Sequence, residues 1–295
     1  MIDTGLDTPA SREAWGQIFA GAFQGRPVTR VIATHLHPDH VGLAGWIAER
    51  FACRLWMTRL EYFQCRLLAA DTGRPAPQAA LDFYRAAGWD EAVLAQCAAR
   101  FGGFGRMIHP LPDAYRRISD GQRLRIGAHD WRVIVGAGHS PEHACLHCPD
   151  LNLLISGDQV LPRISSNVSV YPTEPDADPL SDWLTSLAKL EQALPAEVLV
   201  LPSHNDPFTG LHARLRRLAA GHARGLTRLT HALTQPRRAT DVFAALFARP
   251  ISPDLLGMAT GESLAHLNHL IGQGLASAER DAAGVIWYRQ TAPEA

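Results

Sequence analysis

Short runs of Val, Ile and Leu alternate along this chain with longer segments in which apolar residues recur at helical spacing. This alternation predicts a layered α/β domain, in which helices cover the faces of sheets. The apolar runs expected to be strands are residues 29–33, 54–57, 131–135, 151–156 and 198–201. A further strand at 122–126 is predicted to form a hairpin with 131–135 across the turn Gly127-Ala128-His129-Asp130.

The helices are predicted from spacing and from their ends. Residues 58–106 have helical spacing broken at 73–77 and at Gly88, which predicts two or three inserted helices. Asp178 and Pro179 suit the N-cap and first turn of another helix. Its apolar stripe consists of Leu180, Trp183, Leu184, Leu187 and Leu190. A long helix is expected from Gly210 to Leu233, with leucines on one face. Its opposite face carries Arg214, Arg216, Arg217, Arg224 and Arg228.

The pattern changes beyond Pro236. Two helices, at 241–247 and 262–272, are followed by a predicted hairpin of 276–280 with 285–289. We interpret this region as a small winged-helix-like unit. The expected organisation is a catalytic domain (1–208, with the insertion at 58–106), a connecting helix (209–238) and a C-terminal winged-helix-like domain (239–295).

The composition of the chain excludes several classes of protein. The chain has 295 residues and a net charge of −1, so no global attraction to nucleic acid or membranes is expected. No apolar run is long enough to span a bilayer, and the start of the chain carries no export signal, so we expect a cytoplasmic protein. Five cysteines are too few for a disulfide framework. Histidine stands out, because there are 14 and histidine is the commonest metal ligand.

Four potential ligands lie close together in Thr34-His35-Leu36-His37-Pro38-Asp39-His40, directly after a predicted strand. Because side chains alternate along an extended segment, His35 and His37 should point to the same side. The turn at Pro38 then places Asp39 and His40 at the start of a helix, facing a second position nearby. This spacing predicts a site for two cations.

Three more predicted strands end in the same way. Each runs into a small residue or a proline and then delivers one further ligand type: His139, Asp158 or His204. Side chains at strand ends on one edge of a sheet are held rigidly by the scaffold. We therefore expect these three residues to join the first four.

The order of these seven residues resembles the motif of the metallo-β-lactamase-fold hydrolases. The resemblance implies a metallo-β-lactamase αββα sandwich. It assigns His35, His37 and His139 to one metal ion and Asp39, His40 and His204 to the other, with Asp158 bridging both. The segments around His139, Asp158 and His204 are most similar to the branch with a C-terminal winged-helix-like domain, which includes β-lactamase-like protein 2. They are also similar to the glyoxalase II thioesterases.

Two features depart from the family pattern. The family normally has a β-hairpin before the segment Ile2-Asp3-Thr4-Gly5, so we expect N-terminal strands of the first sheet to be missing through a truncated start. The glycine that commonly follows the distal His-Ser-Pro is Glu142 here, so the turn beside His139 lacks the usual conformational freedom. The resemblance implies that Asp3 orients a metal ligand by a hydrogen bond from behind. The alternative is that Asp3 is an ordinary turn residue.

The ligand types indicate the chemistry. Mixed imidazole and carboxylate ligands suit Zn²⁺, with Fe and Mn as substitutes. Metal binding lowers the pKa of water to about 7, so we expect a metal-bound hydroxide to attack a carbonyl carbon or phosphorus. Asp39 or Asp158 would carry the proton to the leaving group. The sequence therefore predicts a dinuclear metal-dependent hydrolase.

Two substrate classes remain open. The first is a small ester, thioester or lactone, as in glyoxalase-like and lactonase relatives. The second is single-stranded RNA cleaved by an endoribonuclease, with the arginines between Arg214 and Arg228 on the phosphates; a plain solvated helix face is the other interpretation of these arginines. Residues 262–272 contain no Lys or Arg, so the C-terminal unit is expected to pack or form a homodimer and not to read DNA. We favour the small-molecule substrate, and no membrane partner is expected.

Four residues near these motifs have weaker assignments. His143 is expected at the surface beside His139. His212 could approach the site from behind His204, but we favour a structural role for it. Asn167 and Tyr171 are weighed as pocket-lining residues against core or turn roles.

Overall fold

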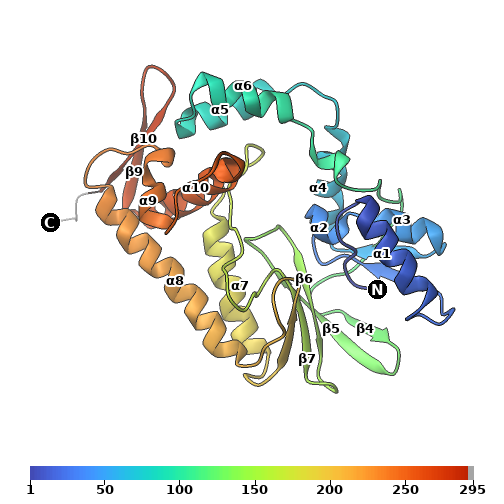
Figure 1. The fold of residues 1–295 in the computed structure, drawn as a ribbon. Helices are drawn as coiled ribbons and strands as arrows, with labels where there is room; N and C mark the ends of the chain where they lie inside the picture. The colour runs from blue at the N-terminus through green and yellow to red at the C-terminus, as the bar shows by residue number, and fades with distance from the viewer. Residues whose placement is uncertain (292–295) are drawn as a thin grey trace.

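Two β-sheets lie face to face at the centre of the structure, a computed structural model that describes residues 1–291 (Figure 1). The first sheet is parallel and contains β1 (Arg30–Ile32), β2 (Arg54–Met57) and β3 (Arg116–Arg117). The second sheet has the order β4-β5-β6-β7-β8, antiparallel except for β7 with β8. Its strands are β4 (Arg123–Ile126), β5 (His129–Gly136), β6 (His143–Cys148), β7 (Leu153–Gly157) and β8 (Leu199–Pro202).

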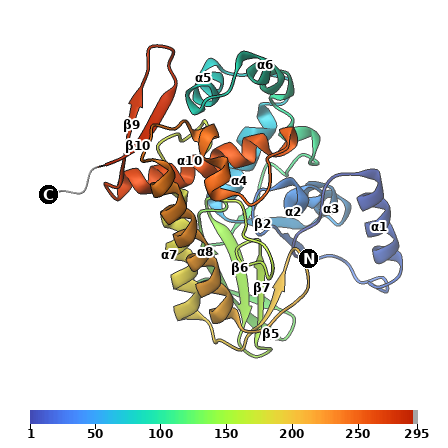
Figure 2. The ribbon, with the colours of Figure 1, turned by 60° about the vertical axis from the view of Figure 1, so that its left-hand side comes forward.

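Helices cover the outer face of each sheet. Next to the first sheet are α1 (Pro9–Ala20), α2 (Pro38–Val41) and α3 (Ala44–Arg50), which share an apolar core with β1 and β2. Next to the second sheet, α7 (Pro179–Ala193) and α8 (Leu211–Ala232) lie side by side (Figure 2). A third apolar layer, including Ile32, Val133 and Leu146, joins the two sheets. The predicted αββα sandwich is therefore confirmed.

The inserted segment is helical, as predicted. It contains α4 (Arg59–Ala70), α5 (Gln78–Ala87) and α6 (Glu91–Arg100), and α5 ends at Gly88 in the left-handed conformation that favours glycine. In Figure 1, α5 and α6 lie above α10 (Leu256–Gly272). The indole Nε1 of Trp89 donates to Thr260 Oγ1 at 3.0 Å, which fastens the insertion to α10.

The predicted helix over 262–272 begins earlier, at Leu256. Glycines at 257 and 261 make this stretch resemble a loop in sequence. In the structure, a Cβ at position 261 would lie 2.8 Å from Ser169 Cβ, so glycine there permits close packing of helix and loop. The other C-terminal elements are three short helical segments and the predicted antiparallel hairpin: η2 (Ala239–Val242), α9 (Phe243–Leu246), η3 (Pro253–Leu255), β9 (Ala276–Arg280) and β10 (Ile286–Gln290).

One apolar cluster runs from the second sheet into the C-terminal helices. It includes Val200 of β8, Leu215 of α8 and Leu264 of α10. The division into 1–208, 209–238 and 239–295, and the winged-helix-like character of the last part, stay predictions. Within residues 1–291, no helix combines the length and apolarity needed to cross a membrane.

Helix α7 is positioned by contacts at both ends. Asp178 accepts a hydrogen bond from Ser181 N at 3.0 Å, so it is the predicted N-cap. Near the other end, Lys189 Nζ donates to Val135 O of β5 at 2.7 Å and lies 2.9 Å from Asp120 Oδ1. The contacts of Lys189 hold α7 against the strand that leads to His139.

Three elements have weak or absent signals in the sequence. Helix α1 buries only Phe19, so its apolar stripe is narrow. Strand β3 is two residues long. All residues of β6 are buried, but its sequence His-Ala-Cys-Leu-His-Cys lacks the Val and Ile enrichment typical of a buried strand.

Candidate metal centre

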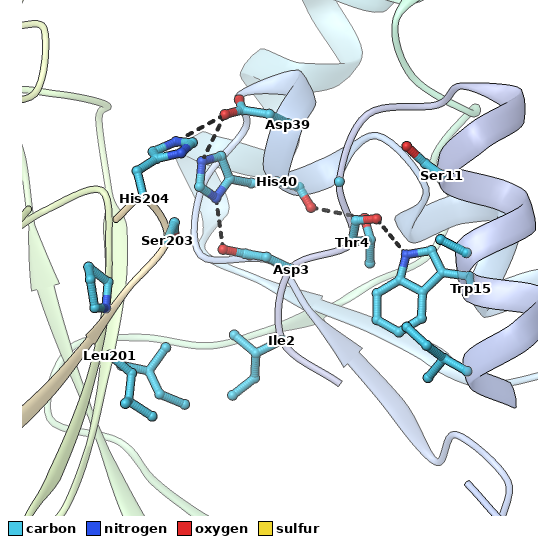
Figure 3. Close-up of a pocket in the computed structure, with 15 residues that line it drawn as sticks. Ile2, Asp3, Thr4, Ser11, Trp15, Asp39, His40, Leu201, Ser203 and His204 are labelled. Carbon is cyan, nitrogen blue, oxygen red and sulfur yellow. Dashed lines mark hydrogen bonds and ion pairs between the residues drawn. The ribbon is translucent and has the colours of Figure 1, made fainter. Parts of the chain in front are cut away.

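The first part of the candidate centre lies between β1 and α2. Asp3 holds this loop from behind, because its Oδ1 accepts from Thr34 N at 2.7 Å and its Oδ2 accepts from Thr34 Oγ1 at 2.8 Å. Asp3 Oδ2 also lies 2.9 Å from His40 Nδ1. The imidazole of His40 is thereby oriented with Nε2 toward the cluster (Figure 3).

Three ring nitrogens converge in one group. His35 Nε2 lies 3.0 Å from His37 Nδ1 and 3.3 Å from His139 Nε2. His139 is oriented by its other nitrogen, which donates to the carbonyl of Asn167 at 2.8 Å. Three imidazole nitrogens within 4.8 Å of one another can hold one cation.

A second group forms beside the first. His204 Nε2 lies 3.2 Å from Asp39 Oδ2, and His40 Nε2 lies 3.4 Å from the same oxygen (Figure 3). His204 and Asp39 have side-chain exposures of 44% and 42%, so this group faces the open side of the site.

Asp158, at the end of β7, stands between the two groups. Its Oδ2 lies 3.6 Å from His139 Nε2 and 3.5 Å from His204 Nε2, and its Oδ1 lies 3.5 Å from His40 Nε2. The structure therefore brings all seven predicted residues together, four from the end of the first sheet and three from the end of the second.

Two atoms of the cluster suit a cation in particular. Among residues 1–291, the buried atoms His40 Nε2 and Asp158 Oδ1 have no hydrogen-bond partner. Buried polar atoms in proteins are normally satisfied, and exceptions call for an explanation such as an ion. The nitrogen and oxygen donors present here fit a divalent cation such as Zn²⁺.

The electrostatics of His35, His37 and His139 agree with this fit. Burial lowers the pKa of His37 to about 3 and also lowers the pKa values of His35 and His139, which keeps these rings neutral, the form that binds cations. Burial also opposes a charge on His40, but Asp158, Asp3 and Asp39 outweigh it and raise the pKa of His40 to about 12. Without a cation, His40 therefore carries a proton, and a cation bound at its Nε2 would have to displace that proton.

A sequence profile described as the metallo-beta-lactamase superfamily matches residues 1–204. The chain belongs to this superfamily. A second profile, the metallo-beta-lactamase-like C-terminal domain, matches residues 226–291. Members of the superfamily bind divalent metals, which agrees with the histidine and aspartate cluster.

Three relatives illustrate the similarity. The crystal structure of a beta-lactamase domain protein from Burkholderia ambifaria has a TM-score of 0.90 and 40% identity, covering 98% of this chain and 83% of that one. A hydroxyacylglutathione hydrolase from Cereibacter sphaeroides is 32% identical over 39% of this chain and 42% of its own length. A probable metallo-hydrolase from Bacillus subtilis is 24% identical over 74% of this chain and 67% of its own length. The chain is therefore a metallo-hydrolase of the metallo-beta-lactamase superfamily.

Glu61 of α4 supports the loops that carry the candidate ligands, a role that the sequence did not predict. It is fully buried and accepts hydrogen bonds from Leu36 N at 2.9 Å, Ser140 Oγ at 2.6 Å and Glu142 N at 2.8 Å. Burial raises the pKa of Glu61 to about 7. Its carboxylate connects the loop of His35 and His37 to the loop of His139. No local sequence pattern predicts that role.

The turn beside His139 is stabilised by Glu142. Its Oε2 accepts from Leu60 N in the first turn of α4 at 2.8 Å, and its carbonyl accepts from Thr58 Oγ1 at 2.7 Å. The side chain that departs from the family pattern therefore anchors the loop to α4.

The surface position expected for His143 is wrong. His143 is fully buried in β6, and its Nε2 accepts from Asp158 N at 3.0 Å. Its ring centroid lies 4.7 Å from that of His35, so it supports both residues from behind. All residues of β6 are buried, so His143, which was expected at the surface, lies inside the protein.

Of the other weighed residues, Asn167 contacts the centre directly. Asn167 orients His139 through its backbone carbonyl. Tyr171 lies on the same loop with 44% of its surface exposed. His212 Nε2 lies 2.8 Å from Leu194 O, the C-cap residue of α7, so its role is structural, as favoured.

A cavity of about 560 Å³ adjoins the second group. Asp39, His40 and His204 line one side of it, and Trp15 and Leu201 line it from two other directions (Figure 3). Space for a small molecule is therefore present beside the exposed part of the cluster.

Proposed function

We propose that this chain is a dinuclear metal-dependent hydrolase. His35, His37 and His139 would hold one divalent cation, and Asp39, His40 and His204 would hold the other. Asp158 would be shared, since its Oδ2 faces a nitrogen from each group. The observation that carries the proposal is the convergence of the seven side chains around His40 Nε2 and Asp158 Oδ1, two buried atoms that lie 3.5 Å apart and have no hydrogen-bond partner among residues 1–291.

Divalent cations, when bound, supply Lewis acidity that polarises a carbonyl and lowers the pKa of water to about 7. Zn²⁺ suits the mixed imidazole and carboxylate donors best, with Fe or Mn as substitutes. The chain's own part is orientation and proton movement. Asp3 and Asn167 orient His40 and His139.

Proton transfer to the leaving group is assigned to Asp39, with Asp158 as the alternative. Asp39 is 42% exposed and lines the cavity of about 560 Å³, whereas the Asp158 side chain is 10% exposed and held among three imidazoles. A leaving group in the cavity would therefore reach Asp39 first.

The proposed substrate is a small ester, thioester or lactone. The match to a hydroxyacylglutathione hydrolase supports this class, and so does a cavity of small-molecule size beside the cluster. Endoribonuclease activity on single-stranded RNA stays a prediction, as do the homodimer and the cytoplasmic location.

The test combines metal analysis of the purified protein with assays on thioesters, lactones, β-lactams and single-stranded RNA. We expect two equivalents of metal and thioester or lactone hydrolysis that chelators abolish. His35→Ala should lose metal and activity, whereas the exposed His231→Ala should keep both. Full, chelator-resistant activity in His35→Ala would refute the proposal.

A further inference from the structure

A second cavity, of about 250 Å³, lies between α8, α10 and the loop that follows Asp158. It is outside the cluster described above, and five of its lining residues are arginines: Arg163, Arg214, Arg217, Arg224 and Arg228. Among its lining residues, Glu262 is the only acidic one. We call this space the arginine cavity.

The cavity results from the spacing of residues on α8. Arg214, Arg217, Arg224 and Arg228 recur at intervals of three, seven and four residues, which places them along one face of the helix. Gly221 and Gly225 lie on the same face and have no side chain to fill the space between the arginines. The result is a recess flanked by guanidinium groups.

Three of the arginines are held in place by other parts of the chain. Arg214 donates to Leu161 O at 2.6 Å and Ile164 O at 2.7 Å, and Arg228 donates to Ala245 O at 2.7 Å. Carbonyl partners fix the direction of a guanidinium but leave its charge uncompensated. Arg163 alone has an acidic partner, Asp206, at 2.7 Å.

The remaining two arginines have no fixed role in the fold. Within residues 1–291, Arg217 and Arg224 form no hydrogen bond or ion pair through their side chains. Glu262 does not pair with them, because its Oε2 accepts from Asn167 Nδ2 at 2.8 Å. Positive charge thus gathers around the recess with little compensation, and burial and Arg217 lower the pKa of Arg214 accordingly.

The guanidinium groups around the recess determine which kind of ligand it can bind. Guanidinium groups bind phosphate oxygens through paired hydrogen bonds, and several together suit a multiply charged anion. The cavity volume falls just below the range of about 300–1,000 Å³ for whole small-molecule sites. It therefore suits the anionic part of a larger ligand.

The cavity is also connected to the candidate metal centre. Arg163, Ser165 and Asn167 lie on one loop, and the carbonyl of Asn167 accepts from His139 Nδ1. Arg163 pairs with Asp206, two residues after His204. A ligand in the cavity would contact the same loop that orients His139.

We propose that the arginine cavity binds the diphosphate group of a carrier to which the substrate's acyl group is attached, so that the substrate is a thioester or ester of a diphosphate-bearing carrier. The substrate assignment rests on the proposed hydrolase function, whereas diphosphate binding does not. The reaction adds water across the acyl–carrier bond and releases a carboxylic acid and the free thiol or alcohol.

Binding is tested by calorimetry with ADP as the probe and adenosine as the ligand control, using metal-loaded protein. ADP should bind and adenosine should not. The double variant Arg217→Gln/Arg224→Gln should weaken ADP binding at least tenfold. Arg216→Gln, on the same helix but paired with Glu191 at 2.6 Å, should bind like the wild type. Equal ADP affinity in all three proteins, or no binding, would overturn the proposal.

Kinetics separate this proposal from the proposed function. For a diphosphate-bearing acyl thioester, the double variant should raise KM about tenfold at unchanged kcat, while a short thioester without phosphate should be hydrolysed as by the wild type. ADP binding without hydrolysis of these thioesters, or of the lactones and esters tested for the proposed function, would refute the hydrolase function and leave the anion site standing. If single-stranded RNA bound through Arg217 and Arg224 more tightly than ADP, the small-molecule carrier would be wrong.

Discussion

At the scale of single residues, the side chains behind the cluster determine its shape. Asp3, Glu61 and His143 are outside the proposed ligand set, yet each contacts a ligand or the loop that carries one. Such supporting contacts fix the orientation of imidazoles and carboxylates, and their loss commonly costs 10–100-fold in metal affinity or activity. Glu61 is the clearest case, because it joins two ligand loops.

We expect Glu61→Gln to lose about 1–3 kcal/mol of unfolding free energy and about 10–100-fold in kcat/KM. The amide nitrogen of glutamine would face the N–H of Leu36 or the donors of Ser140 and Glu142, leaving a buried donor without an acceptor. Urea unfolding and thioester assays at pH 8 measure the two effects. The exposed Glu13→Gln is the control, and equal behaviour of both variants would contradict the role of Glu61.

Glu262 gives the protein a pH-dependent contribution to stability. Burial raises its pKa to about 7, so the folded protein retains this proton at pH values where the unfolded chain has released it. The contribution to stability is therefore greatest at low pH and is lost as the pH rises from about 4.5 to about 7.

Glu262→Gln should remove that dependence and keep the acceptor for Asn167 Nδ2. Relative to the wild type, the variant should be more stable at pH 8 than at pH 5 by about 2 kcal/mol, allowing for partial exposure. Urea unfolding at both pH values measures the difference, with the exposed Glu279→Gln as control. A difference that did not change with pH would show that the glutamate is not held protonated by burial.

The seven candidate ligands could be found in the sequence because all of them lie in the segments that follow predicted strands. Glu61 and His143 could not, for a physical reason. Glu61 meets Leu36 and Ser140, which are 25 and 79 residues away along the chain. Only packing of α4 against both loops makes it part of the site. His143 was misplaced because its burial depends on neighbours on both sides of β6.

At the scale of elements, the N-terminal end of α7 is packed against the loop that carries His139. Gly138 has a φ of +103°, and a Cβ there would lie 2.6 Å from both Pro179 O and Trp183 Cβ. Glycine is thus required by conformation and by space, and α7 cannot shift without moving the next residue, His139.

Gly138→Ala should cost at least about 3 kcal/mol and lower metal content, since strain and overlap add. Gly127→Ala is the matched control: its φ is +61°, but a Cβ there would meet nothing within 4 Å. That variant should lose about 1 kcal/mol and keep its metal. Urea unfolding with metal analysis compares the two, and similar losses in both would exclude the packing role of Gly138.

The ends of helices and strands could be predicted where local sequence signals agreed with one another. They were missed where tertiary packing determines the end of the element. Asp178 and Pro179 mark the start of α7 in sequence and in structure. The start of α10 was missed because Gly257 and Gly261 resemble breakers, although close approach of Ser169 requires glycine at 261. The hairpin of β4 and β5 was predicted correctly, with the turn reduced to Gly127 and Ala128.

At the scale of the whole molecule, the candidate centre joins the two halves of the sandwich. His35, His37, Asp39 and His40 follow the first sheet, whereas His139, Asp158 and His204 follow strands of the second. Cations held by both sets would link the sheets at one edge. This arrangement couples metal content to the stability of the entire fold.

Removal of metal should therefore lower the unfolding temperature. At a metal concentration of about 100 times Kd, binding stabilises the folded state by about 2.7 kcal/mol, which for a chain of this size corresponds to about 4 °C. Calorimetric scans with and without chelator measure the shift. His35→Ala should show a smaller shift, and identical scans of the wild-type protein in both conditions would contradict the link between the sheets.

Lys189, at the contact between α7 and β5, has a practical consequence. It is the only lysine in the sequence, and its side chain is 39% exposed beside Asp120. Amine-directed dyes and cross-linkers would meet one side-chain target at a known position, without engineering. Because the ammonium group is occupied by Val135 O and Asp120, its labelling rate would report how often α7 detaches from the strand that leads to His139.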